Sequence, residues 1–94
     1  DLKCQLSSAA DQQAAMKLLR EKIAAIPNVL QEPAVEVNIL EFNLVGPVLA
    51  VRPYCNNDHY WQVYFDSNRM MSESLAAAGF PAPMATQNMI MKQS

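Results

Sequence analysis

The stretch that decides the fold lies at residues 52–66, where an apolar strand ends and an aromatic-rich helix begins. It reads Arg52-Pro53-Tyr54-Cys55-Asn56-Asn57-Asp58-His59-Tyr60-Trp61-Gln62-Val63-Tyr64-Phe65-Asp66. Pro53 has no backbone N–H, so it ends the strand or leaves it at a sheet edge. Asn57 or Asp58 is then expected to cap the helix. A chain of 94 residues has room for one core only, so the stretch predicts one small domain with helices packed on a sheet.

The helix that begins here is expected to end at Gly79, where a left-handed terminating residue belongs. Its large apolar side chains recur at spacings of three and four, which predicts one buried stripe. The same spacing favours core packing of the aromatic residues over a platform on which bases or ligands stack. The expected stripe consists of Trp61, Tyr64, Phe65, Met71, Leu75 and Ala78.

Strand signals precede this stretch. Residues 2–6 alternate between apolar and polar, and residues 34–42 alternate again in a run rich in β-branched side chains. Residues 43–47 contain Gly46 and are expected to connect that second strand, as a hairpin, to a third strand at residues 48–52.

A helix is expected between the first two strands. Ser7 and Ser8 offer capping hydroxyls, so the helix should begin near Ala9, and Pro27 should stop it. The predicted buried positions recur at helical spacing and are Ala15, Met16, Leu19, Ile23 and Ile26.

The predicted order is therefore β-α-β-β-α. A right-handed crossover places strand three between strands one and two, with both helices on one face. The expected fold is an α+β, ferredoxin-like sandwich over residues 1–83, followed by a tail strand within residues 84–94. That tail is too apolar to remain uncovered and too short for its own core, which predicts a subunit interface formed by Met84, Met89, Ile90 and Met91.

Composition excludes several functions. Seven basic and nine acidic residues give a net charge of −2 with no basic cluster, which argues against nucleic-acid binding. No apolar run approaches the length of a membrane span, so the fragment itself is expected to make no membrane contact. His59 is the only histidine, and no pair of acid, base or nucleophile is placed by spacing, so we expect neither catalysis nor a metal or cofactor.

Two cysteines, Cys4 and Cys55, lack metal-ligand or redox spacing and are expected to be reduced thiols. The predicted strand order leaves one alternative open. Cys4 near the start of the first strand could face Cys55 at the end of its antiparallel neighbour.

The segment from Glu41 to Pro83 resembles the cytoplasmic α/β domain of the small-conductance mechanosensitive channel (MscS) family. The similarity begins with a strand that ends in Arg52 and the aromatic Tyr54. It continues through the helical run Val63-Tyr64-Phe65-Asp66, a helix end at Ala77-Ala78-Gly79, and an exit containing Pro81 and Pro83. The chain departs from the family at Ser67-Asn68-Arg69 and again after Pro83.

This resemblance implies a cage-wall domain on the cytoplasmic side of the inner cell membrane. As part of a homo-heptameric channel, it would contribute to assembly and to solute filtering or modulation of gating. The tail, at residues 84–91, would pair with symmetry mates as a barrel strand. The alternative that the residues leave open is a free-standing ferredoxin-like module that dimerises or binds a small ligand.

Overall fold

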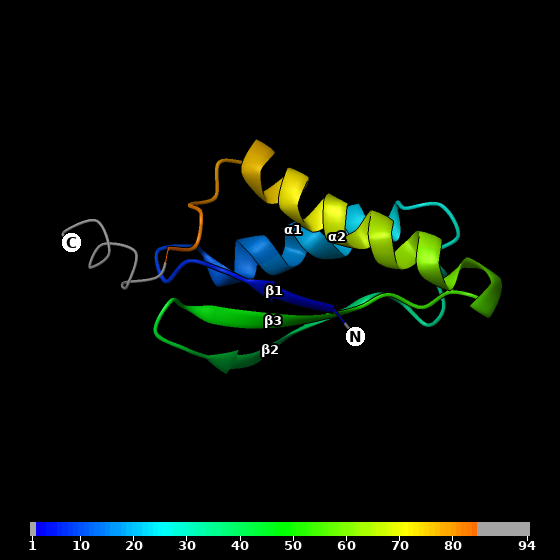
Figure 1. Ribbon diagram of the computed structural model, residues 1–94, viewed down its shortest axis with the longest axis horizontal. Helices are drawn as coiled ribbons and strands as arrows, with labels where there is room; N and C mark the ends of the chain where they lie inside the picture. The colour runs from blue at the N-terminus through cyan, green and yellow to red at the C-terminus, as the bar shows by residue number, and fades with distance from the viewer. Residues whose placement is uncertain (1, 85–94) are drawn as a thin grey trace, which may run out of the picture.

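The centre of the fold is β3 (Pro47–Arg52), which pairs antiparallel with β1 (Leu2–Gln5) on one side and with β2 (Glu36–Phe42) on the other. This order confirms the prediction that the third strand lies between the first two. The structure is a computed structural model that describes residues 2–84. Over those residues it is a small α+β domain with a three-stranded antiparallel sheet and two α-helices (Figure 1).

Both helices, α1 (Gln12–Ala24) and α2 (Tyr60–Ala77), cover the same face of the sheet, as predicted (Figure 1). They pack against each other, with α1 over β2 and α2 over β1. Alternation along the strands aims one set of side chains at the helices. That set forms the sheet side of the core and includes Leu2, Cys4, Val37, Leu49 and Val51.

The first helix begins later than expected. Asp11, not Ser7 or Ser8, is the N-cap, because its Oδ1 accepts the Ala14 N–H at 3.1 Å. Ser7 instead accepts the Ala9 N–H at 3.0 Å within a turn. An aspartate at the cap satisfies a free amide and also suits the positive end of the helix dipole. The predicted buried positions of this helix are all confirmed.

The β2–β3 connection packs against the backbone of residues 6–8 at Gly46, whereas Leu44 remains exposed. Asn43 Oδ1 accepts the N–H groups of Val45 and Gly46 at 2.9 and 3.1 Å, which fixes a tight turn. Gly46 has φ +153°, and a Cβ there would lie 2.6 Å from both Leu6 O and Ser8 N. This close approach explains why glycine is needed at the predicted hairpin. A bulge between Ile39 and Glu41 then ends the regular alternation of β2.

The second helix is entered through a single 3₁₀ turn, η1 (Asn57–His59), and no side chain caps α2. The expectation that Asn57 or Asp58 caps the helix is therefore wrong. The predicted end is confirmed: Gly79 has φ +83°, its N–H donates to Ala76 O at 3.1 Å, and Phe80 N–H donates to Leu75 O at 3.0 Å. These two bonds are the Schellman pattern that closes a helix at a left-handed glycine.

The buried stripe of α2 matches the prediction only in part. Met71 is buried and Tyr64 and Leu75 pack against the core, but Ala78 is exposed and Trp61 and Phe65 are 62% and 61% exposed. The most deeply buried residues of α2 are Val63, Ser67, Met71 and Ser74. Small side chains let a helix approach its neighbours closely, and Trp61 and Phe65 lie on the adjacent, outward strip of the helix.

Two serines on this buried face provide a matched test. Ser67 Oγ is fully buried with no hydrogen-bond partner, whereas Ser74 Oγ donates to Met70 O. We expect Ser67→Ala to raise the free energy of unfolding by up to about 1 kcal/mol, because an unsatisfied hydroxyl leaves the core and alanine favours helix. Ser74→Ala should leave it unchanged or lower it. Urea unfolding measures the stability of both variants. A Ser67→Ala variant less stable than Ser74→Ala would contradict the conclusion that the Ser67 hydroxyl is the one without a hydrogen bond.

The register excludes the alternative pairing of the cysteines. Cys4 lies opposite Leu49 and Leu2 lies opposite Val51, so Cys55 falls beyond the end of β1. Both cysteines are free thiols, Cys4 buried and Cys55 half-buried. No disulfide joins the two cysteines, as expected from the sequence.

Candidate functional site

Four aromatic side chains at the start of α2 form one contiguous surface, here called the aromatic patch: Tyr60, Trp61, Tyr64 and Phe65. Neighbouring ring centroids lie 5.0 to 6.2 Å apart, in edge-to-face and stacked pairs. Tyr60, Trp61 and Phe65 are each at least half exposed. Core packing of this cluster, as predicted from helical spacing, is therefore wrong for these three residues.

The aromatic patch is ordered by its own contacts. Offset and edge-to-face pairs at these distances are the favoured arrangements of aromatic rings and add about 0.5–1.5 kcal/mol each beyond simple burial. Trp61 contacts three rings, those of Tyr60, Tyr64 and Phe65. A rigid apolar surface of this kind loses little side-chain entropy when it is covered, so it is suited to binding another surface.

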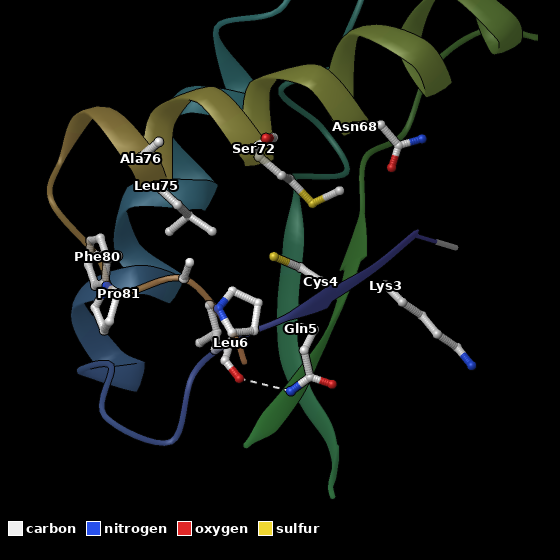
Figure 2. Close-up of a pocket in the computed structure, with 13 residues that line it drawn as sticks. Lys3, Cys4, Gln5, Leu6, Asn68, Ser72, Leu75, Ala76, Phe80 and Pro81 are labelled. Carbon is white, nitrogen blue, oxygen red and sulfur yellow. Dashed lines mark hydrogen bonds between the residues drawn. The ribbon is translucent and has the colours of Figure 1, made fainter. Parts of the chain in front are cut away.

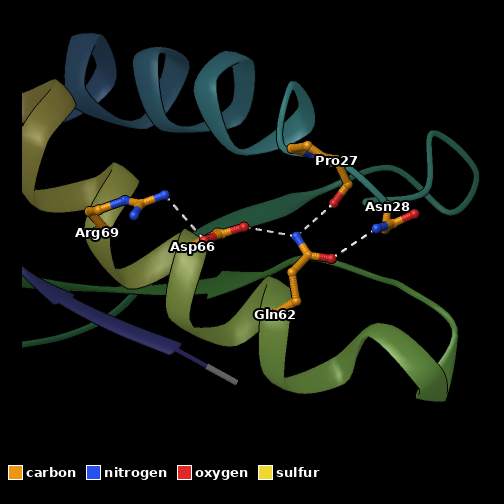
Figure 3. A network of polar contacts seen from close by, with 5 residues as sticks. All are labelled: Pro27, Asn28, Gln62, Asp66 and Arg69. Carbon is orange, nitrogen blue, oxygen red and sulfur yellow. Dashed lines mark hydrogen bonds and ion pairs between the residues drawn. The ribbon is translucent and has the colours of Figure 1, made fainter.

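Beside the aromatic patch, Gln62 joins α2 to the segment after α1 (Figure 3). Gln62 Nε2 donates to Pro27 O at 3.0 Å and to Asp66 Oδ2 at 2.8 Å, while Asn28 Nδ2 donates to Gln62 Oε1 at 2.9 Å. Asp66 also accepts from Arg69 Nη2 at 3.2 Å. Asn28 adopts φ +74°, a region in which asparagine is enriched. The network therefore ties the start of α2, which carries the aromatic patch, to the segment that follows α1.

Sequence reasoning did not single out Gln62 or Asn28. The only available signal was Asn28 after Pro27, which indicates a turn but not its partner. We expect Gln62→Leu to lower the free energy of unfolding by about 1 kcal/mol, because its hydrogen bonds are half exposed and water replaces part of them. Gln13→Leu, at an exposed glutamine of α1, is the control and should change stability little. Equal losses in thermal melts of the two variants would contradict the role of Gln62.

Arg52 and Tyr54, which carry part of the family resemblance, both contact Glu36 of β2. Arg52 Nη1 lies 3.6 Å from Glu36 Oε1, and the Tyr54 hydroxyl donates to the same oxygen at 3.0 Å. Leu30 N–H donates to Tyr54 O at 2.8 Å. The Arg52 and Glu36 side chains are both half exposed, so their ion pair adds little stability. Together these contacts fix the chain where it leaves β3.

A groove of 390 Å³ runs between the outer edge of β1 and α2 (Figure 2). Its lining includes Leu6 from the sheet end, Leu75 from α2, and Phe80, Pro81 and Pro83 from the exit. Lys3 and Cys4 of β1 both line the groove, and the Cys4 side chain points toward α2. Its volume is at the small end of the roughly 300–1,000 Å³ typical of ligand pockets.

Burial raises the pKa of the Cys4 thiol. The thiol therefore ionises at a lower pH in the unfolded chain than in the folded chain. The neutral, buried thiol makes its full contribution to the free energy of unfolding below the ordinary thiol pKa. That stability is lost as the pH rises through the raised value. We therefore expect the free energy of unfolding to fall faster with alkaline pH in the natural chain than in Cys4→Ala. Urea unfolding across an alkaline pH series measures the difference, and parallel curves would contradict it.

The predicted subunit interface is only partly within the described residues. Met84 is 62% exposed, whereas Met89, Ile90 and Met91 lie outside them, as does the rest of the 84–94 segment after Met84. Among residues 2–84, no group of three His, Cys, Asp or Glu side chains is placed to hold a metal ion. His59 lies in η1 beside the aromatic patch.

Comparison with protein families gives no match, and comparison with curated proteins gives none either. No helix among residues 2–84 is both long enough and apolar enough to cross a membrane. The candidate site is therefore defined by its own geometry. It consists of the aromatic patch, held by the Gln62 network, with the groove at the opposite end of α2.

Proposed function

We propose that this chain is the cytoplasmic cage-wall domain of an MscS-type mechanosensitive channel, on the cytoplasmic side of the inner membrane. In that role it helps assemble a homo-heptamer and contributes to solute filtering or to modulation of gating. It performs no catalysis and needs no cofactor. The residues that carry the family resemblance, from Arg52 to Pro83, motivate the proposal.

The fold is compatible with this role. The strand order β1-β3-β2 with both helices on one face is what a ferredoxin-like unit without its fourth strand would have. We propose that classification for the domain. Several of the family-matching residues also have a structural role. Arg52 and Tyr54 fix the end of β3, and Gly79 closes α2 before the prolines.

The observation that carries the proposal is the aromatic patch. It lies inside the segment that resembles the channel family, and it exposes Trp61 and Phe65 by more than half. Exposed apolar surface of this extent usually marks an interaction site. A wall domain packed beside copies of itself would cover it.

Two experiments test the channel proposal. The gene should encode apolar segments of about 20 residues upstream of Asp1, and their absence would overturn the proposal. Cells that lack their own mechanosensitive channels should survive hypo-osmotic shock when they express the full-length protein. Survival no better than with an empty vector, at confirmed membrane expression, would also count against it.

The groove between β1 and α2 favours a second candidate function, a free-standing ferredoxin-like module that binds a small apolar ligand or dimerises. Its lining combines Leu6, Leu75 and Phe80 with the polar Asn68 and Ser72. Dimerisation through the open sheet face is less well supported, because the Arg52–Glu36 ion pair links two strands at one end of that face. A chain truncated after Pro83 that forms a stable dimer and nothing larger would favour this alternative.

A further inference from the structure

The domain has a second exposed apolar surface, here called the hairpin patch: Leu40, Phe42 and Leu44. These residues occupy the end of β2 and the turn that follows, and they are 49%, 65% and 95% exposed. Three hydrogen bonds of the Asn43 side chain make the turn rigid. Its Oδ1 accepts from the N–H groups of Val45 and Gly46, and its Nδ2 donates to Gln5 Oε1 at 2.8 Å. Such a tip costs little entropy when another surface covers it.

The two patches lie at opposite ends of the sheet. Tyr60 and Tyr64 line a small pocket with Leu2 and Arg52, at the start of β1 and the end of β3. The hairpin patch is next to Gln5, at the other end of β1. Figure 1 shows the same arrangement, with the β2–β3 connection at one end of the long axis and the start of α2 toward the other.

We propose that the aromatic patch of one copy docks on the hairpin patch of the next, so that copies of this chain associate head to tail. Two different surfaces on opposite ends form a heterologous contact, which repeats around a ring when its rotation closes. Docking the aromatic patch on itself would give a dimer and leave Phe42 and Leu44 in water. One repeated contact between unlike patches covers both.

The sizes of the two surfaces fit this contact. An aromatic side chain carries roughly 150–250 Å², so three that are half or more exposed leave on the order of 300 Å² of apolar surface. Patches of roughly 300–600 Å² on a monomer are often functional. A stable interface buries about 1,200–2,000 Å² in total, little more than half of it apolar. Two such patches supply much of that apolar part, and polar neighbours such as Glu41 and Arg69 are available for the rim.

The ring in which this contact would sit rests on the proposed function. The head-to-tail proposal adds which two surfaces of neighbouring copies meet in that ring. Two arginine substitutions test it in the 94-residue chain: Trp61→Arg blocks the aromatic patch, and Leu44→Arg blocks the hairpin patch. Both positions are exposed, so neither change disturbs the core. Ala77→Arg adds the same charge at an exposed position in the last turn of α2, away from both patches.

Sedimentation velocity across a concentration series provides the measurement. The natural chain and Ala77→Arg should form species larger than dimers, and either blocking variant alone should associate roughly tenfold or more weakly. The decisive sample is the mixture of Trp61→Arg and Leu44→Arg. Each variant keeps the patch that the other lacks, so the mixture should form a one-to-one dimer that neither forms alone.

Three outcomes would overturn the head-to-tail contact: a natural chain that stays monomeric up to its solubility limit, blocking variants that assemble like the natural chain, or a Leu44→Arg variant that dimerises by itself. Circular dichroism of each variant establishes that it is folded. The channel proposal fails separately, through missing upstream membrane segments or lost shock survival, and it can fail while the mixed variants still dimerise.

Discussion

Leu49→Ala should lower the free energy of unfolding by about 2–5 kcal/mol. Leu49 is fully buried in the central strand, opposite Cys4 on one side and Ile39 on the other. Truncation removes its apolar burial and leaves a cavity that two neighbouring strands prevent from collapsing. For a domain of this size, each 1 kcal/mol corresponds to a fall of about 4–8 °C in Tm, so the variant should be partly unfolded well below the melting point of the natural chain.

Leu44→Ala is the matched control for that experiment. It makes the same chemical change at a leucine that is 95% exposed. At protein concentrations too low for copies of the chain to dock, it should alter stability by no more than about 0.5 kcal/mol. Urea unfolding of both variants, with the slope checked for constancy, separates core packing from general effects of the leucine-to-alanine change. Similar midpoints for the two variants would show that the β3 strand is not at the centre of the core.

Gly46→Ala is expected to be the most damaging single methyl addition in the described chain. The new Cβ would lie 2.6 Å from Leu6 O and Ser8 N and 2.8 Å from Ser7 C, all backbone atoms that cannot swing aside. The backbone also has φ +153°, which side chains rarely adopt. Relief requires the segment after β1 to move away from the hairpin, so we expect a loss of roughly 3 kcal/mol or more.

Gly79→Ala separates the clash from the conformational strain. Gly79 also has positive φ, +83°, but an added Cβ would meet nothing within 4 Å. Only the left-handed conformation is penalised, at about 1–2 kcal/mol. In thermal melts, the Tm of Gly46→Ala should therefore be clearly lower than the Tm of Gly79→Ala. The reverse order would mean that the hairpin is not packed against residues 6–8 as described.

The sequence predicted the strand order through the right-handed crossover rule and the expected hairpin. It also predicted the buried positions of the first helix and the glycine that ends the second, because each of these depends on a strong local signal. It failed in part on α2, where Trp61 and Phe65 are exposed while Tyr64, Met71 and Leu75 do pack against the core. Val63, Ser67, Met71 and Ser74 recur at helical spacing just as the aromatic stripe does, so the segment contains two overlapping stripes. A prediction based on hydrophobicity alone chooses the stripe with the larger apolar side chains. The most deeply buried stripe is instead the one that contains the two serines.

Other parts of the site depend on contacts between distant segments. Gln62 reads as an ordinary solvent-facing helix residue until Pro27 and Asn28 are placed beside it. The register of β1 against β3, which separates Cys4 from Cys55, is likewise fixed by pairing that no local pattern specifies. Fold class therefore followed from periodicity, while the aromatic patch and its supporting network needed tertiary structure.

The closure of α2 has a practical consequence. All the hydrogen bonds that end the helix lie between Ser74 and Phe80, and the two prolines after them each fix a backbone torsion. The path of the chain through residues 79–83 is thus constrained by these hydrogen bonds and by two fixed φ torsions. A peptide grafted after Met84 would therefore start from a constrained exit, a useful property for a domain that is to carry a chosen segment.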